Sequence, residues 1–188
     1  SGPHRRGLTP SQTVGPYFHQ GLDWPFANRL FDAVVDEQRI TISGQIRDGE
    51  NQPVADALIE IWQADAAGIY HHQQPCSHTT TGGCGGLGRV ATDAHGVYCF
   101  HTIKPGPTTD DLGVHAPHIN LTVFARGLLL HLYSRLYFAD ESSANARDPV
   151  LQCVPVERRQ TLLAESDHDG YHLDIKLQGD NETVFFDV

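Results

Sequence analysis

The residues best suited to chemistry lie in a stretch, residues 117–127, that alternates like a β-strand. Ile119, Leu121, Val123 and Ala125 share one face, whereas the other face carries His118, Asn120, Thr122 and Phe124. Two histidines at this His-x-His spacing would point two imidazoles at one metal ion from the same side of a sheet. Here Asn120 stands at the second position, so the strand offers half of such a pair.

Other donors lie nearby in the chain. Tyr70, His71 and His72 belong to an irregular, glycine-rich segment, and His115 precedes His118 by three positions. On one continuous strand, positions three apart face opposite ways, so His115 and His118 meet only if the chain bends between them. His71 and His72 are expected to face solvent.

The elements around this stretch are mostly short strands separated by turn residues. Alternation and turn signals predict strands over residues 39–47, 57–63, 89–92, 97–102, 128–138, 171–177 and 183–186. One short helix is expected over residues 140–147, with Asp140 as its N-cap and Asp148-Pro149 as its stop. Residues 157–163 fit a helix or a strand. This pattern predicts an all-β fold, an antiparallel β-sandwich or barrel with irregular loops and one short helix.

Composition and net charge exclude some classes of binding partner. A chain of 188 residues with 39% hydrophobic residues fits one domain. A formal net charge of −10 argues against nucleic acid or an anionic membrane as partner, and no apolar run is long enough to span a bilayer. Four cysteines without a CxxC pair predict reduced thiols in the cytoplasm.

The expected organisation has three parts: a flexible N-terminus over residues 1–8, an extended arm over 9–38 and the sandwich over 39–188. In the arm, residues 9–18 carry two prolines and a glycine, which prevent regular structure. Val14, Tyr17 and Phe18 are nevertheless apolar. The arm is therefore expected to pack, either on its own domain or in a partner's pocket.

Several short motifs carry a family resemblance. They are residues 9–17 (TPSQTVGPY), 59–65 (IEIWQAD), 102–106 (TIKPG), 116–119 (APHI), 124–127 (FARG), 135–138 (RLYF) and 181–187 (NETVFFD). In this order they resemble the intradiol ring-cleaving dioxygenases, and the last three resemble the α-type chain of the family's two-chain members. The resemblance covers about Thr9 to Val188.

The resemblance implies an Fe³⁺ ion, because the family's β-type chain holds one with two tyrosinates and two histidines, a donor set that suits a hard ferric ion. This sequence departs from that set. Asn120 replaces the second histidine, no tyrosine lies between Gly106 and Asn120, and Tyr70 lies too near the end of the preceding strand to match. The expectation is that the β-type partner holds the iron and that His118 is a buried, hydrogen-bonded remnant.

The resemblance also implies a role at a shared active site. Family α and β chains pair as pseudo-symmetric sandwiches in an (αβ)n hetero-oligomer that cleaves a small aromatic substrate with O₂. In that arrangement Thr13, Gly15, Pro16 and Tyr17 of the arm would line the substrate cavity. Arg126 would pair with a substrate carboxylate or, alternatively, would be a surface arginine at a strand end.

Two alternatives remain open. The chain could be a self-sufficient metalloenzyme of the same fold that uses His118 with other donors. It could also be a non-catalytic β-sandwich that serves as a scaffold.

Overall fold

The computed structural model describes residues 27–31, 39–71, 85–125, 128, 131–168 and 170–187. This part of the chain consists mainly of strands with three short helical segments. In chain order, the strands are β1 (Arg39–Arg47), β2 (Leu58–Gln63), β3 (Leu87–Ala91), β4 (Val97–Ile103), β5 (Thr108–Asp110), β6 (Gly113–His115), β7 (His118–Phe124), β8 (Leu132–Phe138), β9 (Leu163–Asp167), β10 (Gly170–His172) and β11 (Ile175–Lys176).

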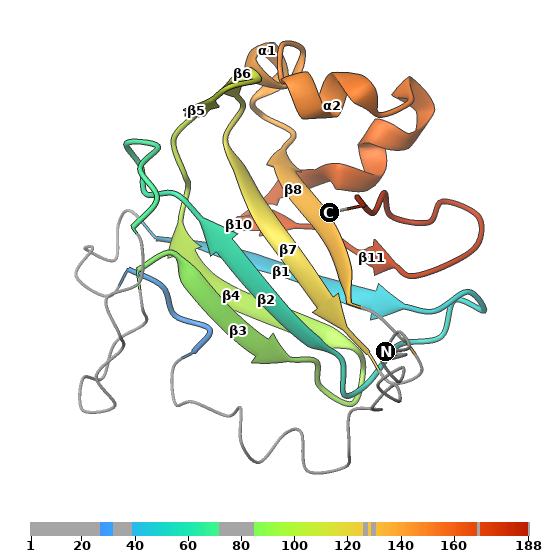
Figure 1. Ribbon diagram of the computed structural model, residues 1–188. Helices are drawn as coiled ribbons and strands as arrows, with labels where there is room; N and C mark the ends of the chain where they lie inside the picture. Colours follow the sequence, from blue (N-terminus) through green and yellow to red (C-terminus); the bar gives the residue numbers. More distant parts are fainter. Residues whose placement is uncertain are drawn as a thin grey trace, which may run out of the picture.

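The strands form two packed layers (Figure 1). One hydrogen-bonded path runs β11-β1-β10-β9-β8-β7-β2-β3, and β4 pairs with the other side of β1. The path folds over itself, so that β3, β2, β7 and β8 lie opposite β4 and β1. The expected β-sandwich is confirmed. It is not purely antiparallel, because β1 pairs in parallel with β10 and β11, and β8 does so with β9.

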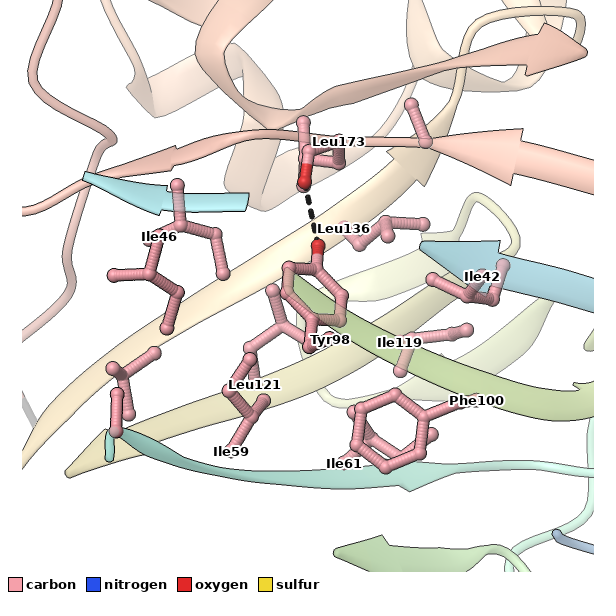
Figure 2. Close-up of a cluster of buried hydrophobic side chains, with 14 of the residues drawn as sticks. Ile42, Ile46, Ile59, Ile61, Tyr98, Phe100, Ile119, Leu121, Leu136 and Leu173 are labelled. Atoms are coloured by element: carbon pink, nitrogen blue, oxygen red, sulfur yellow. Dashed lines mark hydrogen bonds between the residues drawn. The ribbon is translucent and has the colours of Figure 1, made fainter. Parts of the chain in front are cut away.

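The core between the layers follows directly from strand alternation (Figure 2). Ile42 and Ile46 of β1 face Ile59 and Ile61 of β2. With Ile119, Leu121 and Val123 of β7, these residues are at most 1% exposed. Tyr98 of β4 places a hydroxyl in this apolar region, and that hydroxyl donates a 2.6 Å hydrogen bond to the carbonyl oxygen of Leu173.

The helical region differs from the sequence prediction in its boundaries. Two short helices, α1 (Ser142–Asn145) and α2 (Pro149–Cys153), precede a 3₁₀ helix (Val156–Leu162). Asp140 does not cap α1, whose N-cap is Glu141. Asp148-Pro149 begins α2 and does not stop a helix, because the Asp148 carboxylate accepts hydrogen bonds from the amides of residues 150 and 151, and proline suits the first helical turn.

The C-terminal segments are shorter than their alternation predicts. Residues 171–177 divide into β10 and β11, because the chain passes very close to β1 at Leu173. A Cβ added at Gly44 would lie only 1.8 Å from the Leu173 carbonyl oxygen, so this approach requires glycine. Residues 183–186 pair with β8 only through an isolated bridge between Phe186 and Tyr133.

The described part of the expected arm, residues 27–31, packs on the sandwich of its own chain. Arg29 forms a parallel bridge with His101, and Leu30 is fully buried in the core. The rest of the arm lies outside the described residues. Within the described ranges, no helix is both long and apolar enough to cross a membrane.

Candidate functional site

The outer face of β7 carries the polar residues singled out in the sequence. Alternation points His118 and Asn120 away from the core, opposite Tyr137 and Arg135 of β8 in the register of the antiparallel pair. His118 is nevertheless only 3% exposed, because the chain around the start of β7 covers it. These side chains form a buried to half-buried polar cluster. The start of β7 and the end of β8, which carry them, lie at the end of the sandwich where α1 and α2 are drawn (Figure 1).

The loop after β2 brings Tyr70 into this cluster. The Asp65 carboxylate accepts hydrogen bonds from the amides of Ala67 and Ile69 (2.9 and 3.0 Å), which closes a tight turn. Tyr70 then stacks on Trp62, with ring centroids 5.7 Å apart. Its hydroxyl lies 3.3 Å from Nε2 of His118 and accepts a 3.1 Å hydrogen bond from the Asn120 amide. From its sequence position Tyr70 is expected to lie away from such a site, whereas the loop folds it back.

The contacts of His118 define its protonation. Its Nδ1 donates a 2.8 Å hydrogen bond to the Ala116 carbonyl oxygen, so Nε2 carries the lone pair and accepts from the Tyr70 hydroxyl. Burial is the main reason that the pKa of His118 falls to about 4. Burial likewise raises the pKa of Tyr70. Near neutral pH the pair is therefore a neutral imidazole and a neutral phenol.

His115 also joins the cluster, contrary to the expectation for one continuous strand. The chain bends at residues 116–117, between β6 and β7, and brings the two imidazole centroids to 5.8 Å. His115 Nε2 lies 2.8 Å from an Asp110 oxygen, and the hydrogen bond from His115 is the main reason that the pKa of Asp110 is lowered. Nδ1 of His115 lies 3.4 Å from Nη1 of Arg135.

Arg135 supplies a positive charge to the cluster. Its guanidinium also contacts the Tyr137 hydroxyl at 3.5 Å, and its charge acts to lower the pKa values of Tyr70, His118 and Tyr137. For Tyr137, burial outweighs this effect and raises the pKa.

Asp148 anchors the cluster from the helical side. This fully buried carboxylate accepts hydrogen bonds from the Tyr137 hydroxyl (3.0 Å) and the Ala116 amide (2.9 Å) while it caps α2. A buried carboxylate is stable when its lone pairs are satisfied in this way. Asp148 thereby ties α2 to the start of β7.

The donor set of the cluster is a poor match for a metal ion. Nε2 of His118 and the Tyr70 hydroxyl are hydrogen-bonded to each other, and the side chain of Asn120 is a neutral amide. The other imidazole, His115, already lies with Nε2 2.8 Å from Asp110. Among the described residues, no group of three or more His, Cys, Asp or Glu side chains could hold a metal ion. Ferric iron prefers anionic oxygen and imidazole ligands, and the buried phenol is protonated.

The structure does not test the predicted substrate-binding residues. Thr13, Gly15, Pro16, Tyr17 and Arg126 all lie outside the described residues. The structure does describe His118 and confirms that it is buried and hydrogen-bonded.

Four members of the cluster were missed as site residues: Tyr70, Arg135, Tyr137 and Asp148. Three of them left a signal in the sequence. The register of two adjacent alternating strands could have placed Arg135 and Tyr137 on the face of His118. Asp148 before proline also fits a helix N-cap.

Comparisons with known proteins agree with the sandwich and with the motifs. Residues 14–179 match the family described as Dioxygenase. The chain is 43% identical, over 95% of its length and 96% of the relative, to the protocatechuate 3,4-dioxygenase alpha chain of Pseudomonas putida. It is 33% identical to the beta chain of that enzyme from Burkholderia cepacia, over 78% of this chain and 67% of the relative.

A solved structure supports the fold. Catechol 1,2-dioxygenase from Pseudomonas arvilla C-1 superimposes with a TM-score of 0.60 at 21% identity, over 80% of this chain. This chain spans about half of that structure, 55% of its length. At this identity the similarity establishes the β-sandwich architecture.

Proposed function

Because the chain belongs to the dioxygenase family, we propose that it is the α-type subunit of a protocatechuate 3,4-dioxygenase. The reaction is the O₂-dependent intradiol cleavage of protocatechuate, between its two hydroxylated carbons, to 3-carboxy-cis,cis-muconate during aromatic catabolism. The observation that carries this proposal is the match to nearly the whole of an α chain, 96% of its length, against 67% of a β chain.

The location of the iron is part of the proposal. The family implies a non-haem iron, and the side chains around Nε2 of His118 offer one neutral imidazole nitrogen, one protonated phenol and an amide. That set does not fit Fe³⁺. We therefore place the iron on a β-type partner chain, with which this chain would form an (αβ)n assembly.

The arm and Arg126 are proposed to complete the substrate pocket of the partner. Thr13, Gly15, Pro16 and Tyr17 would line the pocket, and Arg126 would pair with the carboxylate of protocatechuate. Arg126 stands two positions after the last residue of β7, and a guanidinium binds a carboxylate through two parallel hydrogen bonds. The setting proposed for this assembly is the cytoplasm, in line with the free thiols of Cys99 and Cys153.

Native mass spectrometry of the protein isolated from its own source, with bound iron counted, tests the subunit assignment. The expected result is a hetero-oligomer in which a second chain of similar size carries the iron. A homo-oligomer that carries its own iron would overturn the assignment and favour the self-sufficient enzyme. A chain without any dioxygenase partner would favour a scaffold.

The role of Arg126 has a separate test in the assembled enzyme. Arg126→Ala is expected to raise the KM for protocatechuate roughly 10- to 100-fold, the value of one charged hydrogen-bonded pair. Turnover of catechol, which lacks the carboxylate, should change little. Arg147→Ala, at an exposed arginine between α1 and α2, is the matched control. Equal effects on both substrates would remove Arg126 from the carboxylate site.

A further inference from the structure

The polar cluster contains a cation of its own, Arg135. We infer that the Arg135 guanidinium takes the place of a metal ion in this chain and excludes one, so that restoring the second histidine alone does not restore metal binding. This inference rests on the proposed function to the extent that the chain belongs to an iron-dependent family. It concerns a property that the proposed function leaves open, namely what keeps the cluster free of metal.

The position of Arg135 is the first argument. It lies directly across from Asn120 in the β7–β8 register, two pairs along from His118 and Tyr137 and therefore on the same face. Side chains that face each other across an antiparallel pair have Cβ atoms about 5 Å apart on the same face. The guanidinium therefore rises beside the position from which a second imidazole would reach a metal ion.

The side chains of the cluster are also hydrogen-bonded to one another. The lone pair of His118 Nε2 is directed at the Tyr70 hydroxyl, and this hydroxyl accepts from Asn120. The Asn120 amide also donates to the Trp62 carbonyl oxygen at 3.2 Å. A metal ion would have to displace the Tyr70 proton and break this chain of hydrogen bonds.

The third argument is the balance of charge. Arg135 contacts His115 and Tyr137, and each of these bridges to a carboxylate, Asp110 in one case and Asp148 in the other. The cluster thus has a fixed positive charge with two negative charges one side chain away. A metal ion would add a second like charge within a few ångströms of the guanidinium, where repulsion is strong in a partly desolvated site.

The test compares full-length chains that carry Asn120→His with different residues at position 135. In one double variant Arg135→Gln removes the charge, and in a second Arg135→Lys keeps it, so that the two share every potential ligand of the restored pair. Each protein is mixed with Fe²⁺ without oxygen and then exposed to air. Bound iron is counted by mass spectrometry, and tyrosinate-to-Fe³⁺ absorption is recorded.

The expected result is that N120H/R135Q takes up iron with a visible tyrosinate band, which disappears when Tyr70→Phe is added. N120H and N120H/R135K should bind iron at least roughly tenfold more weakly, since a nearby like charge remains. Equal binding by all three would overturn the inference that Arg135 excludes metal. No binding by N120H/R135Q would also overturn it, because removal of the guanidinium would then not admit a metal ion.

Two controls keep the outcome interpretable. Far-UV circular dichroism and a denaturation midpoint establish that each variant is folded, and Arg135→Met provides a second neutral side chain if R135Q lowers stability. Iron in the wild-type chain would count against the proposed function. Only the difference between the Gln and Lys variants decides the role of Arg135, so the two failures are distinguishable.

Discussion

Alternation along β7 produces two faces with different roles, one apolar and buried in the core and the other polar. The inner face buries Ile119, Leu121 and Val123 in an apolar core in which fit and volume matter. The outer face carries His118 and Asn120, each bonded to particular atoms of neighbouring residues. The inner face therefore stabilises the fold through many interchangeable contacts, whereas the outer face depends on a few specific pairs.

The largest expected effect therefore comes from the inner face. Phe100 is fully buried in the core, and Phe100→Ala should lower the free energy of unfolding by about 3–5 kcal/mol through lost burial and a cavity. Urea denaturation measures this loss. Phe100→Leu, which keeps most of the volume, should cost much less. A small loss for the alanine variant would show that the layers are not held by this core.

Titration of His118 on the outer face of β7 should make the stability of the fold depend on pH. The pKa of His118 is about 4 in the folded chain and about 6.5 when unfolded, so between these values the unfolded chain binds more protons. Stability should be constant above pH 6.5 and fall as the pH drops from 6.5 toward 4, by at most about 3 kcal/mol.

Denaturation midpoints across this pH window measure the loss. His118→Gln, which does not titrate, should flatten the profile, and His95→Gln at an exposed histidine should leave it intact. A profile that is unchanged in His118→Gln would show that other groups produce the acid sensitivity.

The smallest effects compare two hydroxyls. Tyr98→Phe removes the donor to the buried Leu173 carbonyl and should cost about 1–2 kcal/mol, since a buried acceptor loses a partner. Tyr70→Phe removes contacts in a half-buried loop and should cost about 0.5–1 kcal/mol. Equilibrium unfolding of the two variants tests this order. The reverse order would mean that the outer cluster holds the sandwich together more firmly than the core hydroxyl does.

The same contrast explains how far the sequence alone predicts the molecule. The bounds of β1 match the prediction to the residue, and the buried face of β7 follows from alternation, because a residue's side of a strand depends only on its position. The prediction of one strand over residues 171–177 is wrong. The division of this segment depends on the close approach of Leu173 to Gly44, a contact between segments distant in sequence.

The cluster was harder to predict for a related reason. His118 and Asn120 were found from the pattern of one strand, whereas Tyr70 enters through the turn at Asp65 and His115 through the bend before β7. Loop geometry of this kind depends on tertiary contacts and leaves little periodic signal. The arm residues and Arg126 remain predictions, since they lie outside the described residues.

The parallel pairing of β1 with β10 and β11 also bears on how the chain is made. Thr41 pairs with Gly170 and Ile46 with Ile175, so one edge of a strand from the first quarter of the chain finds its partners only near the end. During synthesis on the ribosome, β1 can pair with β4 long before, but its other edge stays open until β10 and β11 emerge. The segment that closes this edge of the sheet is therefore translated long after β1, and a nascent chain that stalls before it exposes an edge open to aggregation or chaperone binding.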